Sequence, residues 1–221
     1  MNNVELFGGV SKDDVVRFLF KGYYGKHVYL LEKAKRNHNE KIIRIACLRT
    51  AWNDAFRHVS KNAETFKNKS EKEKEERILS ALDCIFADFL ETYMELDSTK
   101  QKTEKLSEWR PKIEKKLSEI KKEVKFGHMQ KLFNMAEKNY LCIYLCRNEL
   151  GLENVVKSYK FDTADCPIDS VIIKKTASAE KTASVIWSEM DEAKYSELQE
   201  RIQQPGKSNL YFDFEHWMET E

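Results

Sequence analysis

Two short stretches of the chain combine residue types that could do chemistry. Residues 127–131 read Gly-His-Met-Gln-Lys and open an apolar segment with helical spacing, and residues 166–170 read Cys-Pro-Ile-Asp-Ser and open the next segment. If both segment starts face one cleft, Lys131 would be a nucleophile beside Asp169, an acid that stabilises positive charge. The structural alternatives are a solvated lysine on an amphipathic helix and an aspartate that caps a helix after a proline.

The segments around these stretches predict an all-α fold of about eight to ten helices. Apolar residues recur at three- and four-residue spacing in nearly every segment, and no ladder of alternating strands with turn signals is present. The expected helices cover about 11–22, 40–59 and 78–96, a stretch from Pro111 towards 124, a long buried helix after Lys131 that Gly151 ends, 167–173 and 191–202, and an aromatic tail at 210–217 that docks as a helix or a short strand.

The length and composition fit one compact helical domain. The 221 residues predict a single domain, 1–221, or two lobes, 1–110 and 111–221, with a cleft between them. No apolar run approaches the roughly 20 residues of a membrane span, and the N-terminus lacks a basic region followed by a long apolar core. We therefore expect a cytoplasmic protein with reduced cysteines and no membrane partner.

Metal and cofactor sites are not indicated by the cysteine pattern. The chain has five cysteines, and Cys142 and Cys146 share a helical face at a spacing of four. No second His or Cys pair has the spacing that would complete a zinc site, so we expect neither a metal ion nor a cofactor. The net charge of +1 indicates no partner, but the lysines between 112 and 131 form a locally basic segment that can follow a phosphate backbone.

The order of glycine, lysine, apolar helix and Pro-Ile-Asp-Ser resembles the active-site arrangement of the helix-hairpin-helix DNA glycosylases, and most closely their divergent archaeal 8-oxoguanine branch. The resemblance covers less than a quarter of the chain and implies that Lys131 is the nucleophile and Asp169 the acid. The family's Leu-Pro-Gly-x-Gly hairpin is reduced to Gly127, the separation of the two residues exceeds that of most members, and the iron–sulfur cysteine quartet is absent.

A glycosylase must flip a nucleotide out of the duplex, surround its base and stabilise positive charge on the sugar. In this hypothesis Asp169 would stabilise the sugar cation and Lys131 would attack C1′. Amides for a base edge would come from Gln130 and Asn134, and an aromatic ring for stacking from Tyr140, Tyr144, Phe161 or Trp187, of which Tyr144 and Trp187 are our candidates. Contacts to the DNA backbone would come from Lys121, Lys122, Lys125, Gly127 and His128.

Two non-catalytic interpretations remain open at this point. A helical adaptor would bind a protein partner through its aromatic tail and mixed-charge surface, for example within a bacterial defence system. A nucleic-acid-binding protein would use the basic segment for phosphate contacts, with Lys131 as one more cation. The sequence leaves the modified base, the strand preference and the oligomeric state open.

Overall fold

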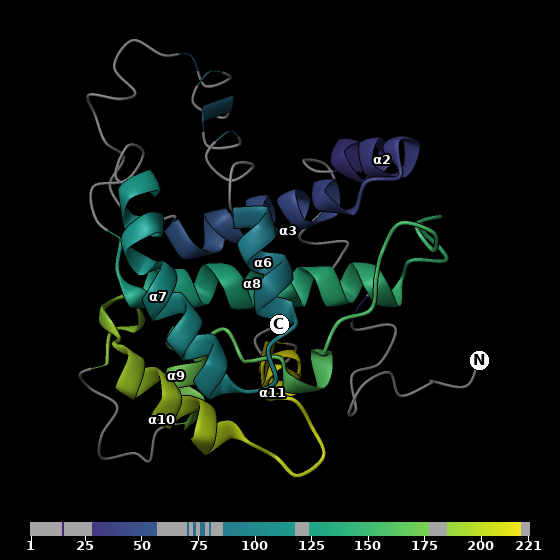
Figure 1. The fold of residues 1–221 in the computed structure, drawn as a ribbon. Coiled ribbons are helices and arrows are strands. Elements are labelled where there is room, and N and C mark those ends of the chain that lie inside the picture. Colours follow the sequence, from purple (N-terminus) through teal and green to yellow (C-terminus); the bar gives the residue numbers. More distant parts are fainter. Residues whose placement is uncertain are drawn as a thin grey trace.

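The computed structural model describes residues 28–56, 86–117, 124–176 and 185–217, together with residues 15, 70, 73, 76, 77 and 80. These residues form eight α-helices and two short 3-10 helices, and no strand occurs among them (Figure 1). The all-α prediction is therefore confirmed. The helix predicted at 11–22 lies outside the described residues except for residue 15, as do most of 78–85 and the candidates Lys121 and Lys122.

The described helices occur in this order along the chain. Their bounds are α2 Val28–Asn37, α3 Glu40–Phe56, α6 Phe86–Met94, α7 Thr99–Leu117, α8 Phe126–Leu145, α9 Ser170–Thr176, α10 Glu192–Ile202 and α11 Asn209–Trp217, and the 3-10 helices are η1 Phe161–Thr163 and η3 Trp187–Glu189.

The centre of the molecule is α8, which neighbouring elements enclose along nearly its whole length. It packs against α3, α6, α7 and η3, and α3 runs beside it. The helices α9, α10 and α11 lie together on the opposite side of α8 from α3 (Figure 1). The buried apolar side chains from the described part of both predicted lobes form one continuous core. The polar and ionisable side chains of α8 therefore face protein on most sides.

The structure corrects the start of the helix that contains Pro111. This helix, α7, begins at Thr99 and passes through residues 110 and 111, so Pro111 lies in its interior instead of its first turn. The polar composition of 97–108 obscured this helix. Its buried side consists of Lys102, Leu106 and Trp109, and the lysine does not count as apolar when the helical spacing is read from the sequence. Burial of a lysine on an inward face cannot be inferred from periodicity alone.

The structure also shows where the long helix ends and which of its two predicted forms the aromatic tail takes. The long helix α8 ends at Leu145, and Gly151 follows in a turn with a φ of 64°, a backbone conformation that favours glycine. The aromatic tail forms a helix, α11, and not a strand, and its Leu210 and Phe214 are buried.

Within the described part of the chain, no helix has the length and apolar character that crossing a bilayer requires.

Candidate functional site

Three elements bring Lys131, Asp169 and Trp187 together near the N-terminal end of α8. The Lys131 Nζ lies 3.7 Å from the Asp169 Oδ2, which is contributed by the residue just before α9. The same Nζ lies 4.5 Å from the centre of the Trp187 ring, which η3 supplies. The Lys131 side chain is 9% exposed and the Asp169 side chain 30%, so the carboxylate is the part of the pair that solvent reaches most easily.

The two oxygens of Asp169 have different partners. Its Oδ1 accepts hydrogen bonds from the backbone amides of Val171 at 2.8 Å and Ile172 at 3.1 Å, in the first turn of α9. Its Oδ2 faces Lys131. The helix cap and the ion pair were alternatives at the level of sequence, and in the structure one carboxylate does both. Capping also fixes the direction in which Oδ2 points.

Three candidates for DNA-backbone contact lie where η3 packs against the start of α8. A Cβ added to Gly127 would lie 2.1 Å from the Trp187 carbonyl oxygen, so only a glycine permits this approach. The Lys125 ammonium pairs with Glu189 of η3. The buried His128 accepts a hydrogen bond at Nδ1 from the Lys125 backbone amide at 3.0 Å, and its ring meets the Trp187 ring edge to face.

The amides of Gln130 and Asn134, both predicted to read a base edge, are fully buried and bonded within the protein. Gln130 bonds to both backbone groups of Ile168, at 2.9 and 3.2 Å. Asn134 donates to the Cys166 carbonyl at 3.1 Å and to the Tyr195 hydroxyl at 2.9 Å. A base could reach these amides only if they gave up those partners, so the structure offers neither of them to a ligand.

Tyr144 does not lie with the Lys131 pair. It is 13 residues further along α8, which places it roughly 20 Å away along the helix axis. There its ring packs 5.6 Å from that of Phe161 and beneath the Arg147 guanidinium, 4.2 Å from the ring centre. Of the two aromatic candidates for base stacking, the structure therefore brings only Trp187 to the pair.

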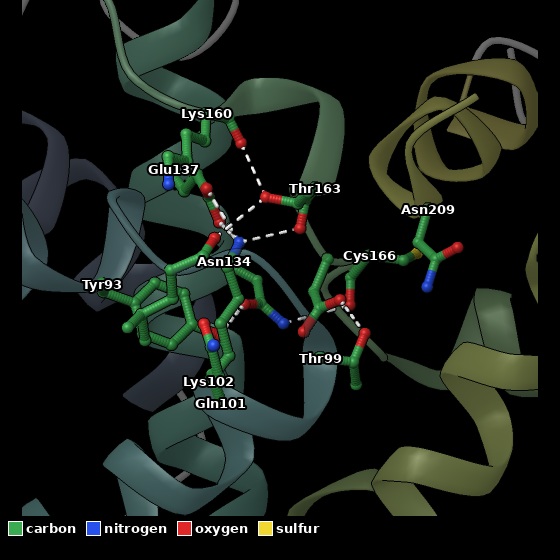
Figure 2. A network of polar contacts seen from close by, with 12 residues as sticks. Tyr93, Thr99, Gln101, Lys102, Asn134, Glu137, Lys160, Thr163, Cys166 and Asn209 are labelled. Carbon is green, nitrogen blue, oxygen red and sulfur yellow. Dashed lines mark hydrogen bonds and ion pairs between the residues drawn. The ribbon is translucent and has the colours of Figure 1, made fainter. Parts of the chain in front are cut away.

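A buried ionic cluster beside α8 was missed by sequence reasoning. Figure 2 shows the Lys102 ammonium between the Glu137 carboxylate, at 2.8 and 2.9 Å, and the Thr163 carbonyl oxygen, at 3.1 Å. Asp165 lies close to this pair and is also buried. Burial raises the pKa of both carboxyl groups, that of Glu137 to about 7, because one ammonium cannot fully compensate two buried carboxylates.

A chain of hydrogen bonds continues from this cluster through the protein interior. The Tyr93 hydroxyl donates to the Asn134 Oδ1 at 2.6 Å, the Asn134 Nδ2 donates to the Tyr195 hydroxyl, and that hydroxyl donates to the Asp165 Oδ2 at 2.7 Å. Desolvation by burial raises the pKa of both tyrosines well above the usual value. Both hydroxyls therefore stay protonated and serve as donors.

One signal in the sequence could have revealed the buried polar groups. Within the apolar helix α8, polar residues recur at three- and four-residue spacing and form what we call the polar stripe, consisting of Gln130, Lys131, Asn134, Glu137 and Lys138. All five are buried, and Lys138 pairs with Asp213 of α11. A polar face on a helix whose other faces are apolar indicates internal partners.

The fold and this site define an all-α protein whose central helix carries an internal stripe of ionisable and amide side chains. Comparisons with protein-family models, curated proteins and solved structures find no match to this chain. Among the described residues, no group of three or more His, Cys, Asp and Glu side chains is arranged to hold a metal ion. The buried Cys142 and Cys166 have thiol pKa values raised by desolvation.

Proposed function

We propose that this protein is a DNA glycosylase-like enzyme that acts in the cytoplasm and removes a modified or damaged base from DNA. The observation that carries the proposal is the 3.7 Å distance between the Lys131 Nζ and the Asp169 Oδ2, together with the partial exposure of the Asp169 side chain. Base excision needs a nucleophile and a negative charge near the sugar, and this pair supplies both. The resemblance of the two motifs to helix-hairpin-helix glycosylases supports the same assignment.

In the proposed reaction, the Lys131 ammonium first loses a proton to water, so that Asp169 keeps its negative charge. The neutral amine attacks C1′ of the flipped nucleotide, the bond from C1′ to the base nitrogen breaks, and the base leaves with the bonding electrons and takes up a proton. The bond from C1′ to O4′ then breaks, O4′ takes one of the two protons on the attached nitrogen, and the other is lost to water, which gives an imine between Lys131 and C1′. Asp169 opposes the positive charge that develops on the sugar.

The other residues of the site have supporting roles in this proposal. Trp187 holds the Lys131 side chain through its ring face, and a cation over an aromatic ring is worth about 0.5–2 kcal/mol. The exposed Lys112 and Lys115 near the end of α7, together with Lys121 and Lys122, would contact phosphates. We assign no base contact to Gln130 or Asn134.

A non-catalytic module that binds nucleic acid or a protein is the second candidate function. One observation favours it. Asp169 caps α9 and Lys131 lies over Trp187, so both residues already have contacts that stabilise the fold. In that case the pair is structural, and its removal would change stability without a chemical consequence.

Base release from duplex DNA separates the two candidates. The purified protein is incubated with duplexes that carry 8-oxoguanine or another oxidised, alkylated or deaminated base, with and without sodium borohydride. We expect free base, and we expect a covalent protein–DNA complex when borohydride reduces the imine. Lys131→Arg should lose the covalent complex but keep DNA affinity, because a guanidinium keeps the cation and does not form the imine.

Asp169→Asn tests the acid, because asparagine retains the oxygen that caps α9 and removes only the charge. It should abolish base release while the protein still folds and binds DNA. Asp191→Asn is the matched control, since Asp191 caps α10 by accepting a hydrogen bond from the Lys194 amide at 2.8 Å. Equal activity in the two variants, or no base release from any duplex by the wild-type protein, would contradict the proposed function.

A further inference from the structure

The segment that leads to Asp169 is held by side-chain amides and not by neighbouring backbone. Residues 166–168 lie in a stretch without regular secondary structure, and the Gln199 side chain of α10 bonds to both backbone groups of Cys166, accepting at 3.1 Å and donating at 2.6 Å. The Gln130 side chain of α8 does the same for Ile168, donating to its carbonyl at 2.9 Å and accepting from its amide at 3.2 Å.

These contacts account for every backbone donor and acceptor of Cys166 and Ile168. Pro167 between them has no N–H to satisfy. Gln130 and Gln199 are 0% and 1% exposed, so their amides have no water to exchange with, and each therefore contributes two hydrogen bonds in a defined orientation. The Ile168 amide can only donate and its carbonyl can only accept, which fixes the orientation of the Gln130 amide. We call the Gln130 and Gln199 contacts the amide clamp.

The two halves of the amide clamp differ in what they connect. Gln130 directly precedes Lys131 on α8, and Ile168 directly precedes Asp169. One side chain therefore joins the backbones beside both members of the pair. Gln199 joins α10 to Cys166, three residues before Asp169, and has no such link to Lys131.

We propose that Gln130 is a positioning residue, which holds the backbone of Asp169 in register with Lys131 so that the carboxylate and the amine meet the same sugar. This inference rests on the proposed function and extends it to a residue that touches neither the substrate nor the reacting atoms. Displacement of a reacting group by about 1 Å can lower a rate roughly 100-fold. Loss of the Gln130 hydrogen bonds should therefore lower the rate of the chemical step and spare DNA binding.

The test compares Gln130→Met with Gln199→Met in the full-length protein. Each change removes one half of the amide clamp with little change in side-chain volume, so we expect similar losses of stability. The single-turnover rate of borohydride trapping on saturating modified duplex should fall about 100-fold for Gln130→Met at unchanged dissociation constant, and far less for Gln199→Met.

Amide hydrogen exchange supplies a readout that does not depend on activity. The amides of Val171 and Ile172 are bonded to the Asp169 Oδ1, so they report on the position of that carboxylate. Exchange at both should accelerate more in Gln130→Met than in Gln199→Met. If Gln130→Met does not fold, Gln130→Asn serves for both measurements, because it keeps a buried amide on a side chain that is shorter by one methylene.

The outcomes separate this inference from the proposed function. If wild-type protein releases no base, the proposed function fails, and exchange at Val171 and Ile172 still decides whether Gln130 positions Asp169. If base release occurs but both glutamine variants lose equal activity and show equal exchange, Gln130 is only one more contact in the core and the positioning role is overturned. A loss of DNA affinity without a change in the trapping rate would overturn it as well.

Discussion

The contact between Gly127 and η3 predicts an unusual response to a conservative substitution. Gly127→Ala inside a helix normally stabilises a protein by about 0.5–1 kcal/mol, because alanine loses less backbone entropy on folding. Here the new Cβ would lie 2.1 Å from the Trp187 carbonyl oxygen and 2.9 Å from two backbone atoms of Ser188. All three neighbours are backbone atoms, which cannot rotate away as a side chain can.

The size of the effect follows from that distance. Ordinary contact begins at 3.4 Å, so η3 must retreat from α8 by roughly 1 Å or more. Overpacking of this kind costs about 1–3 kcal/mol. The Trp187 ring moves with η3 and leaves the Lys131 ammonium, which removes part of a cation–π contact worth about 0.5–2 kcal/mol. After the helix gain of about 0.5–1 kcal/mol is subtracted, we expect Gly127→Ala to destabilise the protein by about 1–4 kcal/mol.

Urea unfolding of the wild type, Gly127→Ala, Trp187→Leu and the double variant measures both parts of this effect. Because the first substitution already displaces the ring, Trp187→Leu should cost less in the Gly127→Ala background than in the wild type. A rise in the free energy of unfolding for Gly127→Ala would show that η3 does not lie on the start of α8. Additive losses in the cycle would separate the glycine contact from the Lys131 contact.

Two further predictions concern the buried charges. The pKa of Glu137 is raised from 4.5 to about 7 in the folded protein, so the folded state binds this proton more tightly than the unfolded state. The stability gained from proton binding is therefore complete below pH 4.5 and is lost as the pH rises to about 7. The free energy of unfolding should decline by about 3 kcal/mol over this range, and Glu137→Gln should flatten the decline in pH-dependent urea titrations; an equal decline in both proteins would contradict the assignment. For the pair of Lys138 and Asp213, Asp213→Leu alone should lower the free energy of unfolding by about 3–5 kcal/mol, because it leaves a buried ammonium without this carboxylate. Adding Lys138→Met should recover part of that loss in the same assay. A further loss in the double variant would refute the argument.

Most of the helices and the location of the two chemical motifs were accessible from the sequence, whereas α2 and the first half of α7 were not predicted. Helical spacing of apolar residues is a local property, and it predicted α3, α8 and α10. The proline and aspartate before residue 170 indicated the start of α9 for the same reason, since capping involves neighbours within one turn. The motif order also selected Lys131 and Asp169, which lie 3.7 Å apart in the structure.

Tertiary structure alone decided which partners the internal polar residues have. Lys102 and Glu137 are residue types that usually lie on a solvated surface. Their side chains are nevertheless 0% exposed, because they form an ion pair with each other between α7 and α8. Gln130 and Gly127 likewise read as part of a ligand-binding motif, whereas their neighbours in space are the backbone of Ile168 and of Trp187. Such partners are distant in sequence and are set by the packing of whole helices, so no local pattern in the chain determines them.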